Sequence, residues 1–257
     1  MYKTKRFTVR KEKDIIKEIR QAAAMGLDFR KVFLADGNPM AMTTKRLLPI
    51  LQEIAKSFPA VRRVSTYALP GDIIRKSRAE LKELKEAGVK LIYVGIESGD
   101  DEVLRMMNKS ETFASSVDGL LKAKEAGIKL SVMILNGVGG KKYSKQHAVN
   151  SARVLNVIQP DYASVLVLSF PYGVEHYKKR FMGDYEEMRI LDLLEEMQWF
   201  MVSTNLENTI FRSDHASNYL ILKGRLNKDK ADFLNRIKFA IEHPSLAGLR
   251  EEWQRGL

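Results

Sequence analysis

The sequence contains no cysteine. Within this chain, that excludes disulfide bonds, a catalytic thiolate, a zinc site with thiolate ligands and a cysteine-held iron–sulfur cluster. Histidine is scarce as well: there are four residues, and none has the HxxxH or HExxH spacing of a zinc site on a helix. We therefore expect no metal ligands in this chain.

Long apolar runs are also missing. The longest are short, such as Leu91-Ile92-Tyr93-Val94, whereas a membrane-spanning helix needs about 20 apolar residues. The basic residues 1–13 include no apolar segment of the kind a secretory signal needs. We expect a cytoplasmic protein without a membrane partner.

Charge of one sign is in excess. Lys and Arg number 43 against 32 Asp and Glu, a formal net charge of +11. An excess of this kind is typical of proteins with anionic partners. The cations are spread along the chain and alternate with Glu, as in Lys82-Glu83-Leu84-Lys85-Glu86. Because a nucleic-acid footprint is usually clustered, this spread favours a solvated surface.

Helix-like and strand-like segments alternate along the chain. The pattern predicts strands over 31–35, 61–67, 90–96, 129–135 and 162–169, and helices over 11–25, 43–57, 75–87, 101–107, 112–126, 144–158, 185–202 and 229–243. Residues 203–225 read as irregular. Lys85–Leu91 recurs as Lys124–Leu130, each copy combining a helix end, a glycine and a strand start. The repeat indicates successive βα units.

Repeated βα units predict an α/β fold, an open and partial TIM-like (β/α) barrel with its helices outside. Five strands are visible, and a closed barrel of this type has eight. Either the barrel is open or part of it is missing. We expect residues 1–173 to form the barrel and residues 174–257 to form a helical extension that packs on or near the barrel mouth.

Ligands of parallel α/β folds bind at the carboxyl ends of the strands. Every loop predicted there contains glycine, and most carry an acid, amide or hydroxyl: residues 35–40, 67–72, 95–100, 135–140 and 169–173. Glu97 could accept hydrogen bonds from ligand hydroxyls, or it could balance a helix dipole. Asp36-Gly37 could let a ligand approach the backbone, or form a tight turn. Residues 137–140 lack the G-x-G-x-x-G spacing of a phosphate-binding loop.

Taken in order, these loops resemble the radical S-adenosylmethionine (radical SAM) superfamily, most closely its Elp3/MiaB/coproporphyrinogen-dehydrogenase-like branch. The resemblance rests on ADGNPM after the first strand, GIESG after the third, MNKSET behind it and the Asn-Gly turn after the fourth, and it covers roughly Phe7 to Gly173. It implies an open (β/α)6 barrel with a [4Fe–4S] cluster and SAM on its carboxyl-terminal face. Reductive cleavage of SAM would give a 5′-deoxyadenosyl radical that abstracts a substrate hydrogen.

The resemblance also implies roles for individual residues. The motif that contacts the SAM amino group matches Ala35-Asp36-Gly37, the ribose-binding carboxylate matches Glu97, and the basic residue near the SAM carboxylate matches Lys109. Adenine would lie against residues 132–136 and 165–168. The implied SAM-binding residues are Asp36, Gly37, Asn38, Ser65, Tyr67, Glu97, Ser98, Lys109, Asn136, Gly137 and Leu168.

The family holds its cluster with Cys-x3-Cys-x2-Cys in the loop after the first barrel strand, and this chain has no cysteine. In close relatives, Met1 would fall just downstream of the third cysteine. We therefore expect a truncated chain that lacks the first barrel strand together with the cysteines, and that is inert alone. A sheet edge exposed beside residues 31–35 would favour oligomer formation.

Two other functions stay open: a clusterless SAM- or nucleotide-binding or scaffolding module, and a TIM-type enzyme that acts on a phosphorylated metabolite through Lys109, Glu97 and Asp36. The substrate, a small molecule or RNA, cannot be read from the sequence. Candidate substrate contacts are His215, Asn218, Tyr219 and Lys223, and nucleic acid would be sought at Tyr172, Lys178, Lys179 and Arg180.

Overall fold

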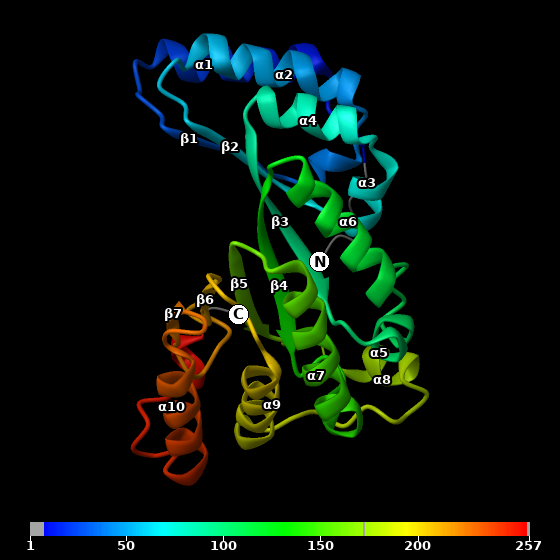
Figure 1. Ribbon diagram of the computed structural model, residues 1–257, viewed down its shortest axis with the longest axis vertical. Coiled ribbons are helices and arrows are strands. Elements are labelled where there is room, and N and C mark those ends of the chain that lie inside the picture. Colours follow the sequence, from blue (N-terminus) through cyan, green and yellow to red (C-terminus); the bar gives the residue numbers. More distant parts are fainter. Residues whose placement is uncertain (1–7, 172, 256–257) are drawn as a thin grey trace.

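The computed structural model describes residues 8–171 and 173–255, which form helices around one curved sheet (Figure 1). The strands are β1 (Lys31–Leu34), β2 (Arg63–Ala68), β3 (Val89–Glu97), β4 (Lys129–Asn136), β5 (Tyr162–Val167), β6 (Ile210–Arg212) and β7 (Lys223–Arg225). The helices are α1 (Glu12–Ala24), α2 (Thr44–Ser57), α3 (Pro70–Arg75), α4 (Arg78–Glu86), α5 (Asp101–Met106), α6 (Phe113–Glu125), α7 (Gly140–Ile158), α8 (Glu175–Arg180), α9 (Ile190–Ser203) and α10 (Lys230–Glu242).

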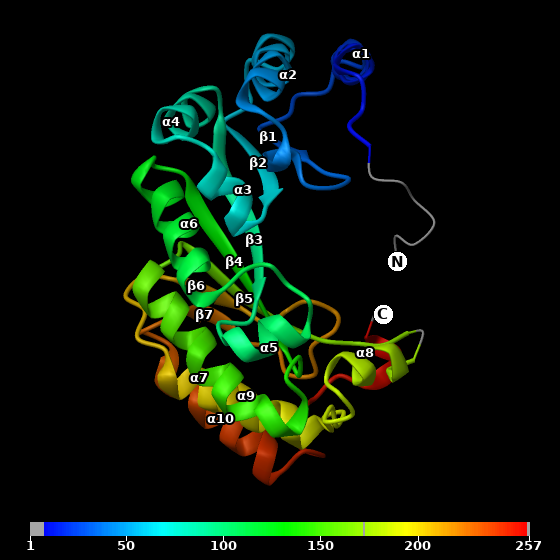
Figure 2. The same cartoon turned by 90° about the vertical axis from the view of Figure 1, so that its right-hand side faces the viewer.

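The seven strands are hydrogen-bonded in chain order, from β1 to β7. Strands β1 to β6 run parallel, and β7 runs antiparallel to β6. In Figure 2 the sheet bends into a crescent, with α4, α6 and α7 along its outer side and an open hollow on the other side. The prediction of an open, barrel-like α/β fold is confirmed.

The main differences from the prediction are two strands, the short helices α3 and α8, and three helix boundaries; α7, for example, begins at Gly140 rather than at residue 144. Residues 210–212 and 223–225 are strands, although residues 203–225 read as irregular. Each is three residues long and holds its place through long-range pairing, with β6 beside β5, so no local pattern marks it. The predicted helix 75–87 corresponds to α4, which begins only at Arg78 because the Ser77 hydroxyl accepts the backbone N–H of Glu80 and caps it, while Arg75 is the last residue of α3. The last long helix begins at Ile190 rather than at residue 185.

The main hydrophobic core fills the space between the sheet and the outer helices. Alternate strand residues point into it, among them Val64, Val94, Val132 and Val165, and each is at most 3% exposed. Side chains of a strand alternate between its two faces. The intervening residues, such as Phe33 and Tyr67, therefore face the hollow, and both are about 40% exposed, at 41% and 42%.

A second, smaller core lies at the carboxyl ends of β4 and β5. It contains aromatic residues from the segment that follows β5, chiefly Tyr177, Phe181 and Tyr185, packed against Tyr143 of α7. Tyr185 packs within this cluster, and its ring centroid lies 4.8 Å from that of Tyr177. This packing explains why the chain around Tyr185 is not helical.

No described helix is long and apolar enough to cross a membrane.

Candidate functional site

The turn after β3 carries a partly buried ion pair at the carboxyl edge of the sheet. The Lys109 ammonium lies 3.4 Å from the Glu97 carboxylate, and the two side chains are 32% and 21% exposed. Glu97 has φ 63°, a left-handed conformation that is uncommon outside glycine. A Cβ on Gly95 would lie 2.7 Å from Glu97 Oε1, so glycine leaves the space into which this carboxylate folds. Two predicted site residues, Glu97 and Lys109, are thus brought together.

Ser98, the next residue, turns into the interior. Its hydroxyl accepts the backbone N–H of Asp100 at 3.0 Å and lies 2.8 Å from Nδ1 of His147. The hydroxyl proton is therefore available for Nδ1, and the other ring nitrogen of His147, Nε2, lies 3.6 Å from Oε1 of Glu196. Ser98, which the resemblance places beside the SAM ribose, here links β3 to α7 and α9.

Glu196 and His147 are both buried, and burial moves their pKa values in opposite directions. Desolvation raises the pKa of the Glu196 carboxyl to about 8 and lowers the pKa of the His147 imidazole to about 4. Hydrogen bonds from Ser144, at 2.5 Å, and from the Gly137 backbone N–H, at 2.7 Å, oppose the rise for Glu196. Between about pH 4 and pH 8, the pair therefore holds one proton in the folded protein.

That proton count predicts how stability depends on pH. In the unfolded chain the ordinary pKa values of 4.5 and 6.5 apply, so from pH 4.5 to 6.5 both states bind one proton and the pair leaves stability unchanged. Above pH 6.5 the folded pair keeps a proton that the unfolded chain has lost. The free energy of unfolding should then fall by roughly 1 kcal/mol per pH unit up to about pH 8. Below pH 4.5 the unfolded chain binds more protons, and stability falls again as the pH drops.

Urea unfolding at a series of pH values checks this expectation, with Glu196→Gln as the comparison. The amide cannot take up or release a proton in this range, so the decline between pH 6.5 and 8 should be missing from the variant. An equal decline in the variant and the parent protein would show that other groups cause it.

The turn after β4 is held by side chains from the segment that follows β5. Glu196 accepts the backbone N–H of Gly137, while the Tyr185 hydroxyl donates to the Gly137 carbonyl at 3.0 Å. The Tyr177 hydroxyl donates to the carbonyl of Val138 at 2.9 Å. Burial raises the pKa of both tyrosines above the ordinary range, so both hydroxyls remain protonated donors. The turn is therefore fixed in place without a ligand.

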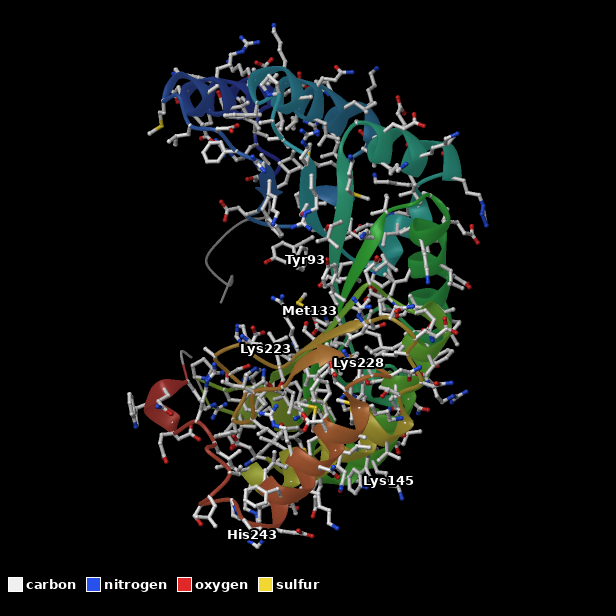
Figure 3. All side chains as sticks on the ribbon, turned by 60° about the vertical axis from the view of Figure 1, so that its left-hand side comes forward. Tyr93, Met133, Lys145, Lys223, Lys228 and His243 are labelled. Atoms are coloured by element: carbon white, nitrogen blue, oxygen red, sulfur yellow. The ribbon has the colours of Figure 1, made fainter. Side chains whose placement is uncertain are left out.

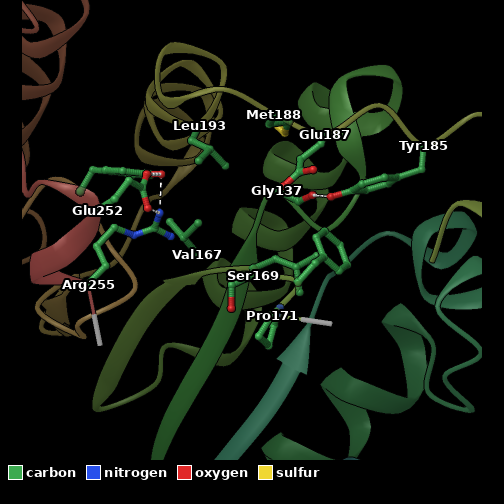
Figure 4. A pocket seen from close by; sticks show the side chains of 13 residues that line it. Gly137, Val167, Ser169, Pro171, Tyr185, Glu187, Met188, Leu193, Glu252 and Arg255 are labelled. Carbon is green, nitrogen blue, oxygen red and sulfur yellow. Dashed lines mark hydrogen bonds and ion pairs between the residues drawn. The ribbon is translucent and has the colours of Figure 1, made fainter. Parts of the chain in front are cut away.

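A cavity of about 300 Å³ opens beside this turn (Figure 4). Gly137 and Leu168, two residues of the predicted SAM site, line it, together with Phe170 and Leu193. On its other side are Glu252 and Arg255 near the end of the chain, with Tyr219. The volume lies at the lower end of the range for small-molecule sites. The carboxyl ends of β4 and β5 thus border a space lined by both apolar and polar side chains.

The turn after β1 lies at a different cavity, of about 340 Å³, lined in part by Asp36 and Asn38. The Asn38 amide donates to Asp72, which also binds Arg75 and is buried, so the turn is tied to α3. Asp36 and Gly37 both have positive φ, of 60° and 134°. Ser65 and Tyr67 belong to β2 and face the hollow, so the predicted SAM residues are spread along the edge of the sheet.

Asn136 of β4 is buried, and its amide donates to the Leu193 carbonyl at 3.1 Å. Two of the substrate candidates contact the protein itself. Asn218 donates to the Val165 carbonyl at 2.8 Å, and His215 Nδ1 lies 2.9 Å from the Ser217 hydroxyl.

The other two substrate candidates lie apart. Tyr219 borders the cavity beside Gly137, hydrogen-bonded to Glu252 and Arg255. Lys223, the first residue of β7, forms an ion pair with Asp214 at 3.0 Å. Tyr172 and residues 1–7 lie outside the described residues.

Sequence reasoning missed four buried residues that fix the turns of the site through hydrogen bonds and close contacts: His147, Tyr177, Tyr185 and Glu196. Two of them had a readable signal. Glu196 stands on the apolar stripe of α9, between Leu193 and Phe200, and His147 stands one turn from both Tyr143 and Ser151 on α7. A titratable residue on an apolar helix face needs a buried partner.

The sequence signature of the Radical SAM superfamily matches residues 2–155, more than half of the chain. The chain belongs to the radical SAM superfamily.

Known radical SAM proteins share this fold at low sequence identity. Coproporphyrinogen III oxidase (HemN) from Escherichia coli superposes with a TM-score of 0.60 at 16% identity, covering 77% of this chain and 48% of HemN. Elp3 from the archaeon Methanocaldococcus infernus gives a TM-score of 0.54 at 15% identity, with coverage of 91% and 59%. The heme chaperone HemW of Bacillus subtilis (strain 168) is 22% identical over 142 residues, 54% of this chain and 38% of HemW. The chain therefore spans only part of the length of these relatives.

The superfamily uses SAM and a [4Fe–4S] cluster. This chain has no cysteine, and its described residues contain no group of three or more His, Asp or Glu placed to hold a metal. Because thiolates hold such clusters, the residues of this chain do not fit a cluster.

Proposed function

We propose that this chain binds S-adenosylmethionine along the carboxyl ends of its parallel strands and supplies no ligand for the cluster that cleaves it. Membership of the radical SAM superfamily supports the choice of ligand. The observation that carries the proposal is the Glu97–Lys109 pair after β3.

The Glu97 carboxylate has the chemistry to accept hydrogen bonds from ribose hydroxyls. The Glu97 side chain is partly exposed at the mouth of the hollow. The backbone φ of 63° at Glu97 is a left-handed conformation that residues of a regular strand do not adopt. A non-glycine residue in this region costs about 1–2 kcal/mol, and such strain often marks functional sites. Lys109 forms an ion pair with this carboxylate and offers a cation to the carboxylate of SAM.

The adenine ring is best accommodated in the cavity beside Gly137. Leu168 and Leu193 in its lining suit a flat heterocycle, and the turn residues there are held in place in advance. A preorganised site loses less free energy on binding than one that must be ordered. An enzyme of phosphorylated metabolites is less well supported, because residues 137–140 lack the G-x-G-x-x-G spacing of a phosphate-binding loop.

Without a thiolate in the chain, we expect SAM to bind and remain intact. An electron donor and cluster ligands would have to come from outside this sequence. The described residues would then position the nucleoside, and Glu97 and Lys109 would fix its polar groups.

Isothermal titration of the full chain with SAM tests the proposal. Glu97→Ala should weaken binding roughly 10- to 100-fold, because hydrogen bonds to a charged group contribute about 1.5–3 kcal/mol. Glu83→Gln, an exposed carboxylate change on α4, is the matched control and should leave binding unchanged. Undetectable binding by the parent chain, or equal binding by Glu97→Ala, would contradict the proposal. Tighter binding of ATP than of SAM would favour a general nucleotide-binding module instead.

A further inference from the structure

The hollow face of the sheet has a strong bias in charge. The seven strands contain a single acid, Glu97, at the very end of β3. Strand register places six cations on the hollow side: Lys31, Arg63, Lys129, Arg212, Lys223 and Arg225. All except Arg63 are exposed, and two of them have acidic partners, Lys129 with Asp161 at 3.8 Å and Lys223 with Asp214 at 3.0 Å, which leaves four cations without an ion pair among the described residues. A surface of one sign attracts a ligand of the opposite sign and concentrates it there.

Aromatic rings stand between these cations on the same face. Tyr67, Tyr93 and Tyr162 lie in one register row that ends at Arg225, and Phe33 packs against the first two with ring centroids 4.9 and 5.4 Å away. Figure 3 shows Tyr93, Met133 and Lys223 along the hollow, with Lys145 and His243 away from it. Flat rings beside cations are the combination that binds single-stranded nucleic acid, through base stacking and phosphate contacts.

Three serine side chains also lie on the hollow face of the sheet. Ser65, Ser131 and Ser164 lie on it in the register rows of the aromatic residues and cations; Ser65 and Ser131 are buried, and Ser164 is partly exposed. None of these three hydroxyls is hydrogen-bonded to a described residue. The Nε of Arg63 likewise has no partner in the described part of the chain. The partly exposed Ser164 hydroxyl can bind a 2′-hydroxyl, the group that distinguishes RNA from DNA.

We propose that the hollow face of the sheet binds a short single-stranded segment of RNA. The width of the face supports a polymer over a compact anion, since seven strands about 4.8 Å apart extend roughly 29 Å along the sheet. Cations stand at both ends of that width, Lys31 and Arg63 on one side and Arg212 and Arg225 on the other, with the rings between them. This inference rests on the sheet face and not on the Glu97–Lys109 pair or the cavity beside Gly137, which carry the SAM proposal.

Fluorescence anisotropy of the full chain with a labelled single-stranded RNA of about ten nucleotides tests the proposal. Tyr93→Ala should weaken binding roughly 5- to 150-fold, the effect of removing one stacking ring. Tyr93→Phe keeps the ring and should bind like the parent chain. Tyr93 is outside the proposed SAM contacts, so SAM titration of the same variants separates the two proposals.

The phosphate contacts have a test of their own. Arg212 and Arg225 are not ion-paired with described residues, and replacing both with alanine should lower the log–log salt slope of RNA binding by about 1.4. The control is the double change Lys45→Ala and Lys82→Ala on α2 and α4, which should leave the slope unchanged. Equal effects of the two double variants would overturn the proposal.

Three further outcomes would also overturn it. These are no binding of RNA by the parent chain, equal binding of DNA of the same sequence, and concentration-dependent dimers, measured by light scattering, that exclude RNA from the face. Duplex RNA should bind more weakly than the single strand, because its bases are already stacked.

Discussion

Replacing Glu196 with alanine should lower the free energy of unfolding by about 3 kcal/mol or more. The change removes the acceptor for the Gly137 N–H and the Ser144 hydroxyl, both in the interior. A buried donor left without a partner costs about 1–3 kcal/mol, and two are affected here. The vacated carboxylate volume and the lost contact with His147 add to this loss.

The neighbouring Glu195→Ala provides the control, because Glu195 is exposed on the same helix and its loss should change stability by less than about 0.5 kcal/mol. Urea unfolding of both variants at pH 6 measures the difference. Hydrogen exchange at the backbone N–H of Gly137 should rise in Glu196→Ala beyond the rise expected from global unfolding. Similar stability of the two variants would mean that Glu196 does not hold the turn after β4.

The fold was predictable because its core obeys local rules. Most of the long strands are apolar runs, such as Val165 with its neighbours, and two helix–strand junctions share one pattern, at Gly88 and Gly127. Both glycines have positive φ, 112° and 78°, so the repeat reflects a conformation that few other residues adopt. Local propensity and tertiary packing agree at these positions, and they fix the order of the sheet.

The parts that could not be predicted depend on contacts between distant residues. Three-residue strands such as β6 and β7 exist only because β5 offers an edge. The link from Ser98 through His147 to Glu196 joins residues about 50 positions apart in the sequence.

The cluster of cations on the hollow face also depends on pairing between residues that are distant in the sequence. Cations spread evenly along the chain meet on one face because strand register places them there, so counting charge runs in the sequence could not reveal the cluster.

Replacing Gly99 with alanine should destabilise the protein by about 3 kcal/mol and displace the turn that carries Glu97. A Cβ on Gly99 would lie 2.7 Å from the carbonyl carbon of Asn150 and 2.8 Å from the Cα of Ser151. Both atoms belong to the backbone of the 19-residue helix α7, which cannot move aside like a flexible side chain. Overpacking of a dense interior typically costs about 1–3 kcal/mol, and backbone contacts place this site at the upper end.

Gly71→Ala is the matched control for this change. Its nearest neighbour would be the Arg75 guanidinium at 3.6 Å, and Gly71 lies within α3, so alanine there should be neutral or stabilise by about 0.5 kcal/mol. Thermal unfolding compares the two variants, and SAM titration below the melting temperature of Gly99→Ala tests the turn itself. Because Gly99 donates its N–H to the Ser151 hydroxyl at 2.9 Å, separating β3 from α7 breaks that bond and moves Glu97. A Gly99→Ala protein that melts and binds SAM like Gly71→Ala would show that the close approach of this turn to α7 is not required.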